Sequence, residues 1–283
     1  MSSILTNNSA MVALQTLQSV NKNLANTQDA ISTGKDIATA KDNSAIFAIS
    51  KVMESDIAGF KAISDSLSLG QATVAVASSA AEQIVEELNG IKGLIVSAQS
   101  ENVDHAKIQE DISQRTAQIA SVISAAQFNG TNLLNTDVDG AGAGTTTFNV
   151  LASLDRVGTA APAPTNISVA SVDFEANLDL VTNLTAITDT TTAATALGEI
   201  ETFIQTAVTG AASLGAAASR IDSQSEFVSK LTDSLTSGVG ALVDADLEAA
   251  SARLQALQVQ QQLATQSLSI ANQAPQSILS LFR

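Results

Sequence analysis

The fold is decided by residues 46–98, IFAISKVMESDIAGFKAISDSLSLGQATVAVASSAAEQIVEELNGIKGLIVSA, in which apolar side chains recur at two positions of every seven. The first set of positions is Ile46, Met53, Phe60, Leu67, Val74, Ala81, Leu88 and Ile95. The second set is Ile49, Asp56, Ile63, Gly70, Ala77, Ile84, Ile91 and Ala98. Only Asp56 and Gly70 interrupt this pattern, which is typical of a coiled-coil helix. Such a helix would extend roughly 80 Å, so we predict a rod and not a rounded globular core.

Helical periodicity continues elsewhere in the chain. A second run covers Ile108–Ala126 and stops at Phe128-Asn129-Gly130, where we expect the chain to reverse. A third run steps by sevens from Ile200 to Leu242, and a fourth alternates steps of three and four from Leu247 to Ala271. We expect Pro275 to end the last helix, because proline has no N–H to donate. Helices from the two ends of the chain should then pack together antiparallel.

Residues 131–195 lack the seven-residue repeat. Alternating apolar and polar side chains at Thr145–Leu151 and Ile167–Phe174 predict one or two β-hairpins, followed by a Thr-rich linker at Thr182–Thr195. The predicted fold class is therefore mainly α: a long antiparallel helical coiled-coil rod with a small β-hairpin-containing central region. Its predicted parts are a terminal helical coiled-coil domain (1–44 and 243–283), a helical rod domain (45–130 and 196–242) and a short hairpin and loop region (131–195).

The composition excludes several classes of function. The formal net charge is −15, which argues against binding to nucleic acid and to anionic membrane surfaces. The chain has no Cys and a single histidine, His105, so zinc sites and histidine-based catalytic triads lack their residues. Asp137-Val138-Asp139-Gly140 resembles half of a calcium loop without its later bidentate acid, so an acidic β-turn is the better interpretation. We predict no catalytic residue, no cofactor and no metal, and hence no enzyme.

Both ends of the chain are nearly free of charged side chains. Residues 1–34 carry only Lys22 and Asp29, and residues 250–283 carry only Arg253 and Arg283. The polar positions there hold Gln, Asn, Ser and Thr, which neighbours can bury at a lower desolvation cost than ions. We therefore expect other copies of the chain to cover these ends. The candidate interface residues are Leu5, Leu14, Leu17, Leu24, Ile31, Leu247, Leu254, Leu257, Leu268, Ile278, Leu281 and Phe282.

Short motifs at both ends, taken in order, resemble those of bacterial flagellins. They are NNSA (7–10), ISTGKDI (31–37), AKDNSA (40–45), IQEDI (108–112), FNG (128–130), DADL (244–247), ANQ (271–273) and ILSLFR (278–283). The resemblance covers about residues 3–134 and 214–283. It implies a structural subunit of the flagellar filament, with the terminal domain lining the lumen and residues 131–195 on the outer surface. A hook–filament junction (hook-associated) protein has similar ends, whereas a soluble helical signalling or scaffold coiled coil would share the heptads but not the motif order.

The resemblance also implies partners and a location. The chain would form a helical homopolymer and be secreted through the flagellar type III export apparatus, with a C-terminal export chaperone covering its exposed ends. Hook-associated junction and cap proteins would adjoin the filament, and neither nucleic acid nor membrane would be a partner. Such export would explain why no signal peptide and no membrane-spanning stretch is visible in an extracellular protein.

The sequence departs from some flagellins in the segment that vertebrate innate receptors detect. Where those flagellins carry Gln-Arg and Arg-Glu pairs, this chain has Asn89-Gly90 and Lys92-Gly93, and only Leu94 is kept. We expect altered recognition, because an Arg fork is a strong hydrogen-bonding group. Four threonines beside the small-residue and proline-containing stretches should be reachable for O-glycosylation. They are Thr145, Thr146, Thr147 and Thr165.

Overall fold

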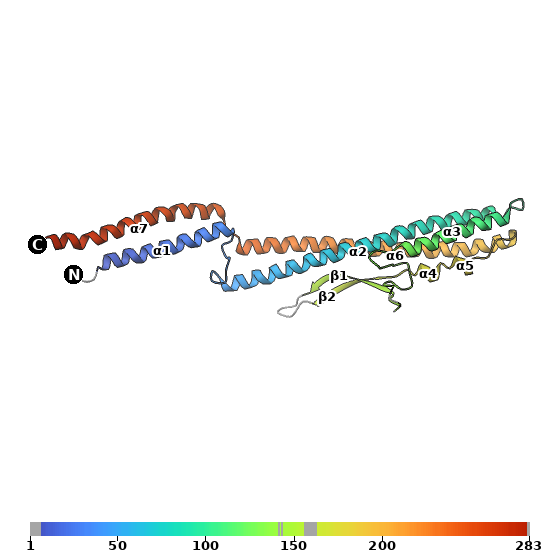
Figure 1. The fold of residues 1–283 in the computed structure, drawn as a ribbon, viewed down its shortest axis with the longest axis horizontal. Coiled ribbons are helices and arrows are strands. Elements are labelled where there is room, and N and C mark those ends of the chain that lie inside the picture. Colours follow the sequence, from blue (N-terminus) through green and yellow to red (C-terminus); the bar gives the residue numbers. More distant parts are fainter. Residues whose placement is uncertain (1–6, 141, 143, 156–162, 282–283) are drawn as a thin grey trace. The chain divides into compact units, whose positions relative to one another are not determined.

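The computed structural model describes residues 7–140, 142, 144–155 and 163–281, with residues 274–281 described by backbone alone. The elements are α1 (Asn8–Thr33), α2 (Ser44–Ser97), α3 (His105–Ala125), β1 (Thr147–Asp155), β2 (Ala163–Ala170), α4 (Phe174–Asn177), α5 (Leu180–Asn183), α6 (Thr190–Val243) and α7 (Leu247–Leu281) (Figure 1). They form two compact units, which we call the terminal unit (Met1–Ile57 with Asp233–Arg283) and the central unit (Ala58–Thr232). Long helices with one small antiparallel hairpin among the described residues confirm the predicted fold class.

In the terminal unit, α1 and α7 lie side by side and run in opposite directions (Figure 1). α1 begins after Asn7, whose side chain accepts a hydrogen bond from the Ala10 N–H and so caps the helix. It ends at Gly34, which has a φ of 71° in the left-handed region that glycine adopts without strain. The side chains buried in this pair are Val20, Thr27, Leu257 and Ala264. The terminal unit is therefore held by a narrow seam of small and medium-sized residues.

The core of the central unit is built mainly by α2, α3 and α6. Heptad positions such as Leu67 and Ile95 of α2 and Ile221 of α6 are fully buried, as the periodicity predicts. Ile112 and Ile119 of α3 join the same cluster. Because these apolar residues recur every three or four positions, each helix presents one continuous stripe to the others.

The chain reverses after α3 at the predicted position. Asn129 and Gly130 have φ values of 51° and 83°, as both central residues of a tight hairpin turn require. Phe128 and Thr131 exchange two backbone hydrogen bonds across the turn, of 2.9 and 3.0 Å. The Asn-Gly dipeptide therefore forms the turn for which its sequence is suited.

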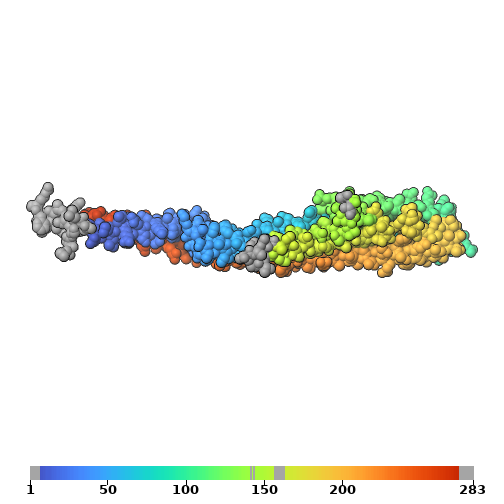
Figure 2. Space-filling model, turned by 90° about the horizontal axis from the view of Figure 1, so that it is seen from below, coloured from blue at the N-terminus to red at the C-terminus, as the bar shows by residue number. Residues whose placement is uncertain are grey.

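The hairpin of β1 and β2 packs on two of the long helices. Figure 2 shows it as the yellow-green segment lying between the cyan surface of α2 and the orange surface of α6. A Cβ on Gly70 of α2 would lie only 2.7 Å from the γ-carbons of Val150 in β1. On the other side, Gln224 Nε2 of α6 donates a hydrogen bond of 2.9 Å to the Ala152 carbonyl. Gly70 interrupts the predicted heptad pattern because the hairpin needs close access to α2 there.

The predicted strand boundaries are wrong by several residues. The first strand extends to Asp155, and the second begins at Ala163 and ends at Ala170. Pro164 lies within β2, which has only one partner strand and so tolerates a residue without an N–H. Val172 and Phe174 gave residues 167–174 their alternating pattern, but they follow the strand. Both are apolar because they pack on Gly210 of α6.

Two helix boundaries also differ from the prediction. α6 begins at Thr190, inside the predicted Thr-rich linker, because Asp189 Oδ1 accepts a hydrogen bond of 2.8 Å from the Thr192 N–H at the helix start. The prediction that Pro275 ends the last helix is wrong, since α7 continues to Leu281. Proline removes one helical hydrogen bond, and the carbonyl left without it, that of Ala271, accepts one from the side chain of Asn7, which precedes α1.

Candidate polymerisation interface

Half of the predicted interface residues line the seam between α1 and α7. Together with Val20 and Thr27 of α1 and with Gln261 and Ala264 of α7, they recur at steps of three and four, so they occupy one face of each helix. Leu257 is 7% exposed, and the others are half-buried. The seam residues among the predicted set are Leu17, Leu24, Ile31, Leu254, Leu257 and Leu268.

The other predicted residues lie away from the seam or beyond the described side chains. Leu14 and Leu247 are exposed, at 46% and 51%. Ile278 and Leu281 belong to the part of α7 described by backbone alone. Leu5 and Phe282 lie outside the described residues.

A second apolar face of α7 was missed by the sequence analysis. Val259, Leu263 and Ile270 are exposed, at 55%, 57% and 63%. At about 100° per residue they fall within roughly 40° of one another and on the opposite side of the helix from Leu257. We call these three residues the outer face of α7. The spacing of four and seven residues could have revealed it, but the stronger three-four seam on the same helix obscured it.

The segments that connect the helices of the terminal unit are paired with each other. Asp36 N–H donates to the Val243 carbonyl at 2.8 Å, and Ala245 N–H donates to the Gly34 carbonyl at 2.9 Å. Glu54 of α2 adds two ion pairs, with Lys51 Nζ at 2.6 Å and Lys35 Nζ at 3.3 Å. Hydrogen bonds from Lys51 and then Lys35 hold the pKa of the Glu54 carboxyl below its usual range. The connection after α1 is therefore tied both to the connection after α6 and to α2.

These ties should loosen in acid, and Glu54 should contribute to that loss. Because the folded pKa of Glu54 lies below the ordinary value of 4.5, its stabilisation is present above that value and lost as the pH falls through the folded pKa. At neutral pH, Glu54→Gln should make residues 34–43 more sensitive to limited proteolysis, whereas well below pH 4.5 the two proteins should be cut at equal rates. Glu248→Gln, an exposed acid on α7, is the matched control and should show no such difference. An excess sensitivity of Glu54→Gln that persists unchanged in acid would contradict this assignment.

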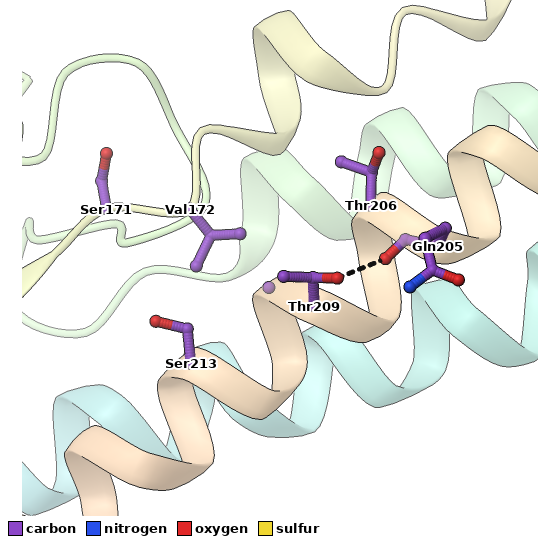
Figure 3. Close-up of a pocket in the computed structure, with 7 residues that line it drawn as sticks. Ser171, Val172, Gln205, Thr206, Thr209 and Ser213 are labelled. Atoms are coloured by element: carbon purple, nitrogen blue, oxygen red, sulfur yellow. Dashed lines mark hydrogen bonds between the residues drawn. The ribbon is translucent and has the colours of Figure 1, made fainter.

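One hollow in the central unit is lined by side chains that are neither acidic nor basic. Figure 3 shows it between α6 and the segment after β2, with a volume of about 390 Å³. Its lining consists of Ser171, Val172, Gln205, Thr206, Thr209, Gly210 and Ser213. The Thr209 hydroxyl donates to the Gln205 carbonyl of its own helix at 2.8 Å, as the dashed line in Figure 3 marks. No side chain of this lining is an acid or a base at neutral pH.

The segment for which the resemblance predicts altered innate-receptor recognition is partly covered by neighbouring helices. A Cβ on Gly90 would lie 2.7 Å from Arg115 Nη1 of α3, and the same atom pairs with Glu87 Oε2 at 2.7 Å. Lys92 forms an ion pair with Glu201 of α6. Asn89 donates to the carbonyl of Val85 in its own helix, Gly93 is exposed and Leu94 packs against the core.

The four threonines predicted to be reachable differ in their surroundings. Thr146, Thr147 and Thr165 are exposed, and Thr145 is half-buried. Thr147 and Thr165 lie in strands and not in loops. The hydroxyl of Thr145 donates to Asp139 Oδ2, and that of Thr165 to Asp155 Oδ2, each at 3.0 Å.

Two family descriptions match the chain. The bacterial flagellin N-terminal helical region matches residues 4–138, and the bacterial flagellin C-terminal helical region matches residues 197–282. A flagellin of Brucella melitensis is 47% identical over 289 residues, covering 100% of both chains. The chain belongs to the bacterial flagellin family. Flagellin FljK of Caulobacter vibrioides is 41% identical over 286 residues, covering 100% of this chain and 99% of its own. Among solved structures, a Bacillus cereus flagellin has a TM-score of 0.47 at 18% identity, with 59% of this chain and 88% of that chain covered.

As a flagellin, the chain is a structural subunit that polymerises with copies of itself into the flagellar filament, and it is not an enzyme. The filament is an extracellular structure that serves motility. The relatives that span the whole chain carry flagellin names, which does not favour the alternative of a hook–filament junction protein. Across the described ranges, no helix has both the length and the apolar character needed to cross a membrane.

Proposed function

We propose that polymerisation buries the outer face of α7 against neighbouring subunits, while the seam between α1 and α7 forms within each subunit. The observation that carries this proposal is the alignment of Val259, Leu263 and Ile270 on the side of α7 away from Leu257. Single exposed apolar residues are ordinary, but an aligned set on a helix face without charge is typical of an interaction surface. The residues around it are uncharged, as in Gln258-Val259-Gln260-Gln261-Gln262, so neighbours can cover them without burying ions.

We extend the proposal to the placement of the parts in the filament. Residues 1–44 and 243–283 line the lumen, residues 45–130 and 196–242 form the rod, and residues 131–195 face the exterior. The charge distribution supports this order, because residues 131–195 carry seven acids, whereas residues 1–34 and 250–283 carry only one, Asp29. The acids of that region are Asp137, Asp139, Asp155, Asp173, Glu175, Asp179 and Asp189.

The outer face of α7 is also the surface through which we propose that the remaining partners bind. A subunit outside the filament carries an uncovered apolar face on α7, which a C-terminal chaperone would shield before the flagellar export apparatus takes the chain. The ends of the filament present the same face to hook-associated junction and cap proteins. In the rod, we propose weakened innate-receptor recognition, because Gly90 stands where the recognised flagellins carry an Arg and Arg115 covers it. Thr146, Thr147 and Thr165 are the better candidates for O-glycosylation, since they are exposed.

The double substitution Val259→Ser with Leu263→Ser tests the outer face. Each side chain is about half exposed in the single chain, so covering the rest should contribute roughly 1 kcal/mol or slightly less. Because two side chains are changed, the critical concentration for assembly of the purified protein should rise roughly ten- to thirtyfold. Gln260→Ser, an exposed polar side chain on the same helix, is the control and should leave it nearly unchanged. Unchanged assembly of the double variant would show that this face stays open in the filament.

A further inference from the structure

Asn7 makes hydrogen bonds to two helices at once. Its Oδ1 accepts from the Ala10 N–H at 3.1 Å, which caps α1, and its Nδ2 donates to the Ala271 carbonyl of α7 at 2.8 Å. Both Asn7 and Ala271 are half-buried. The oxygen of the Asn7 amide therefore binds α1, and its nitrogen binds α7.

The Ala271 carbonyl is available because of a proline. In an α-helix this carbonyl would accept from the N–H four residues later, which belongs to position 275. Pro275 has no N–H, yet α7 continues through it to Leu281. A partly buried carbonyl without a donor is costly, so the amide of Asn7 replaces the helical bond that proline cannot make.

A second amide tie lies further along the same pair of helices. Gln261 Nε2 donates to Asn21 Oδ1 at 2.7 Å. Gln261 occupies a seam position that is otherwise apolar, and single polar residues at such positions specify the register of paired helices at some cost in stability. Regularly repeated apolar residues alone would allow α1 to slide along α7, whereas both amide ties are made in one register only.

We propose that Asn7 and Pro275 act together as a register clip for α1 and α7, with proline exposing the Ala271 carbonyl and Asn7 binding it. This inference rests on the proposed role of the terminal unit in polymerisation, because the clip fixes the pair in the arrangement that neighbouring subunits bind. Asn7 is a positioning residue in this view. Its effect on assembly should depend on the residue at position 275. An effect through capping of α1 alone would not depend on that residue.

The test compares assembly in two backgrounds. Asn7→Asp keeps the shape and the capping oxygen but replaces the donor by an acceptor, so it should raise the critical concentration of the purified full-length chain roughly tenfold. Pro275→Ala restores an N–H at position 275. In that background, Asn7→Asp should raise the critical concentration by roughly twofold or less, because the helix itself then satisfies the Ala271 carbonyl. Asn8→Asp adds the same charge one residue away and should have little effect in either background.

Three results would overturn the clip: no effect of Asn7→Asp, an equal effect in both backgrounds, or an equal effect of Asn8→Asp. Running Val259→Ser with Leu263→Ser in parallel separates this failure from that of the proposed outer face. If the outer-face variant impairs assembly but positions 7 and 275 show no coupling, only the clip fails. If the coupling is present and the outer-face variant assembles normally, the clip stands and the outer face is wrong.

Discussion

Changing Leu254 and Leu257 together to alanine is expected to stop filament formation at concentrations that suffice for the unmodified protein. Leu257 is only 7% exposed, and Leu254 lies half-buried on the same face of α7. Truncating a buried leucine costs about 2–5 kcal/mol, so the pair should lose on the order of 5 kcal/mol. That loss corresponds to more than about a thousandfold in critical concentration.

The same substitutions should leave the central unit intact. Its core draws on residues from Ile63 to Val228 and includes neither leucine, so its thermal unfolding by circular dichroism should be unchanged. Polymer recovered by sedimentation measures assembly. Leu247→Ala removes a leucine that is 51% exposed on the same helix. It should raise the critical concentration far less than the double substitution does. If the double variant polymerises normally, the seam is not packed in the filament.

The seam is weak enough that assembly must help to form it. Among the described side chains of α1 and α7, the buried ones are Val20, Thr27, Leu257 and Ala264. Ordering two helices of this length costs about 1–2 kcal/mol of backbone entropy per residue, which so few buried side chains cannot offset. We therefore expect the pair to become fully ordered as subunits assemble, when the outer face of α7 is covered as well.

Periodicity was sufficient to predict the long helices, because burial on one face repeats along the sequence. Leu67 and Ile95 are buried at the positions that a seven-residue repeat requires. The turn at Asn129-Gly130 was predictable for a similarly local reason, since the two residues themselves favour positive φ. In each case the information lies within a few neighbouring residues.

Contacts between distant segments leave no such local pattern. Val172 and Phe174 alternate like a strand, but their burial comes from α6 and not from a sheet. Pro275 resembles a helix end, but α7 continues past it, and the donor that reaches the Ala271 carbonyl belongs to Asn7, far away in the sequence. Gly70 interrupts the heptads for a reason that appears only when Val150 is placed against it.

Gly210 should be the glycine of α6 least able to accept a side chain. A Cβ there would lie 2.2 Å from Val172 Cγ1 and 2.6 Å from Phe174 Cε1, and Phe174 is fully buried. These distances are too short for non-bonded carbon atoms, so the segment after β2 must move. Gly210→Ala should therefore destabilise the central unit by about 1–3 kcal/mol, the usual cost of overpacking. This loss should appear despite the gain of up to about 1 kcal/mol that alanine brings inside a helix.

Replacing two other glycines of α6 by alanine should change the stability in the opposite direction. A Cβ on Gly198 or Gly215 would meet nothing within 4 Å. Their alanine variants should therefore stabilise the protein by about 0.5–1 kcal/mol, through helix propensity alone. Denaturant unfolding of the three variants measures both effects in one experiment. The midpoints should shift in opposite directions, while the dependence of the unfolding free energy on denaturant concentration stays unchanged. If Gly210→Ala stabilised the protein as much as the two controls do, Val172 and Phe174 could not be packed on α6, and the close approach of residues 171–174 to that helix would be wrong.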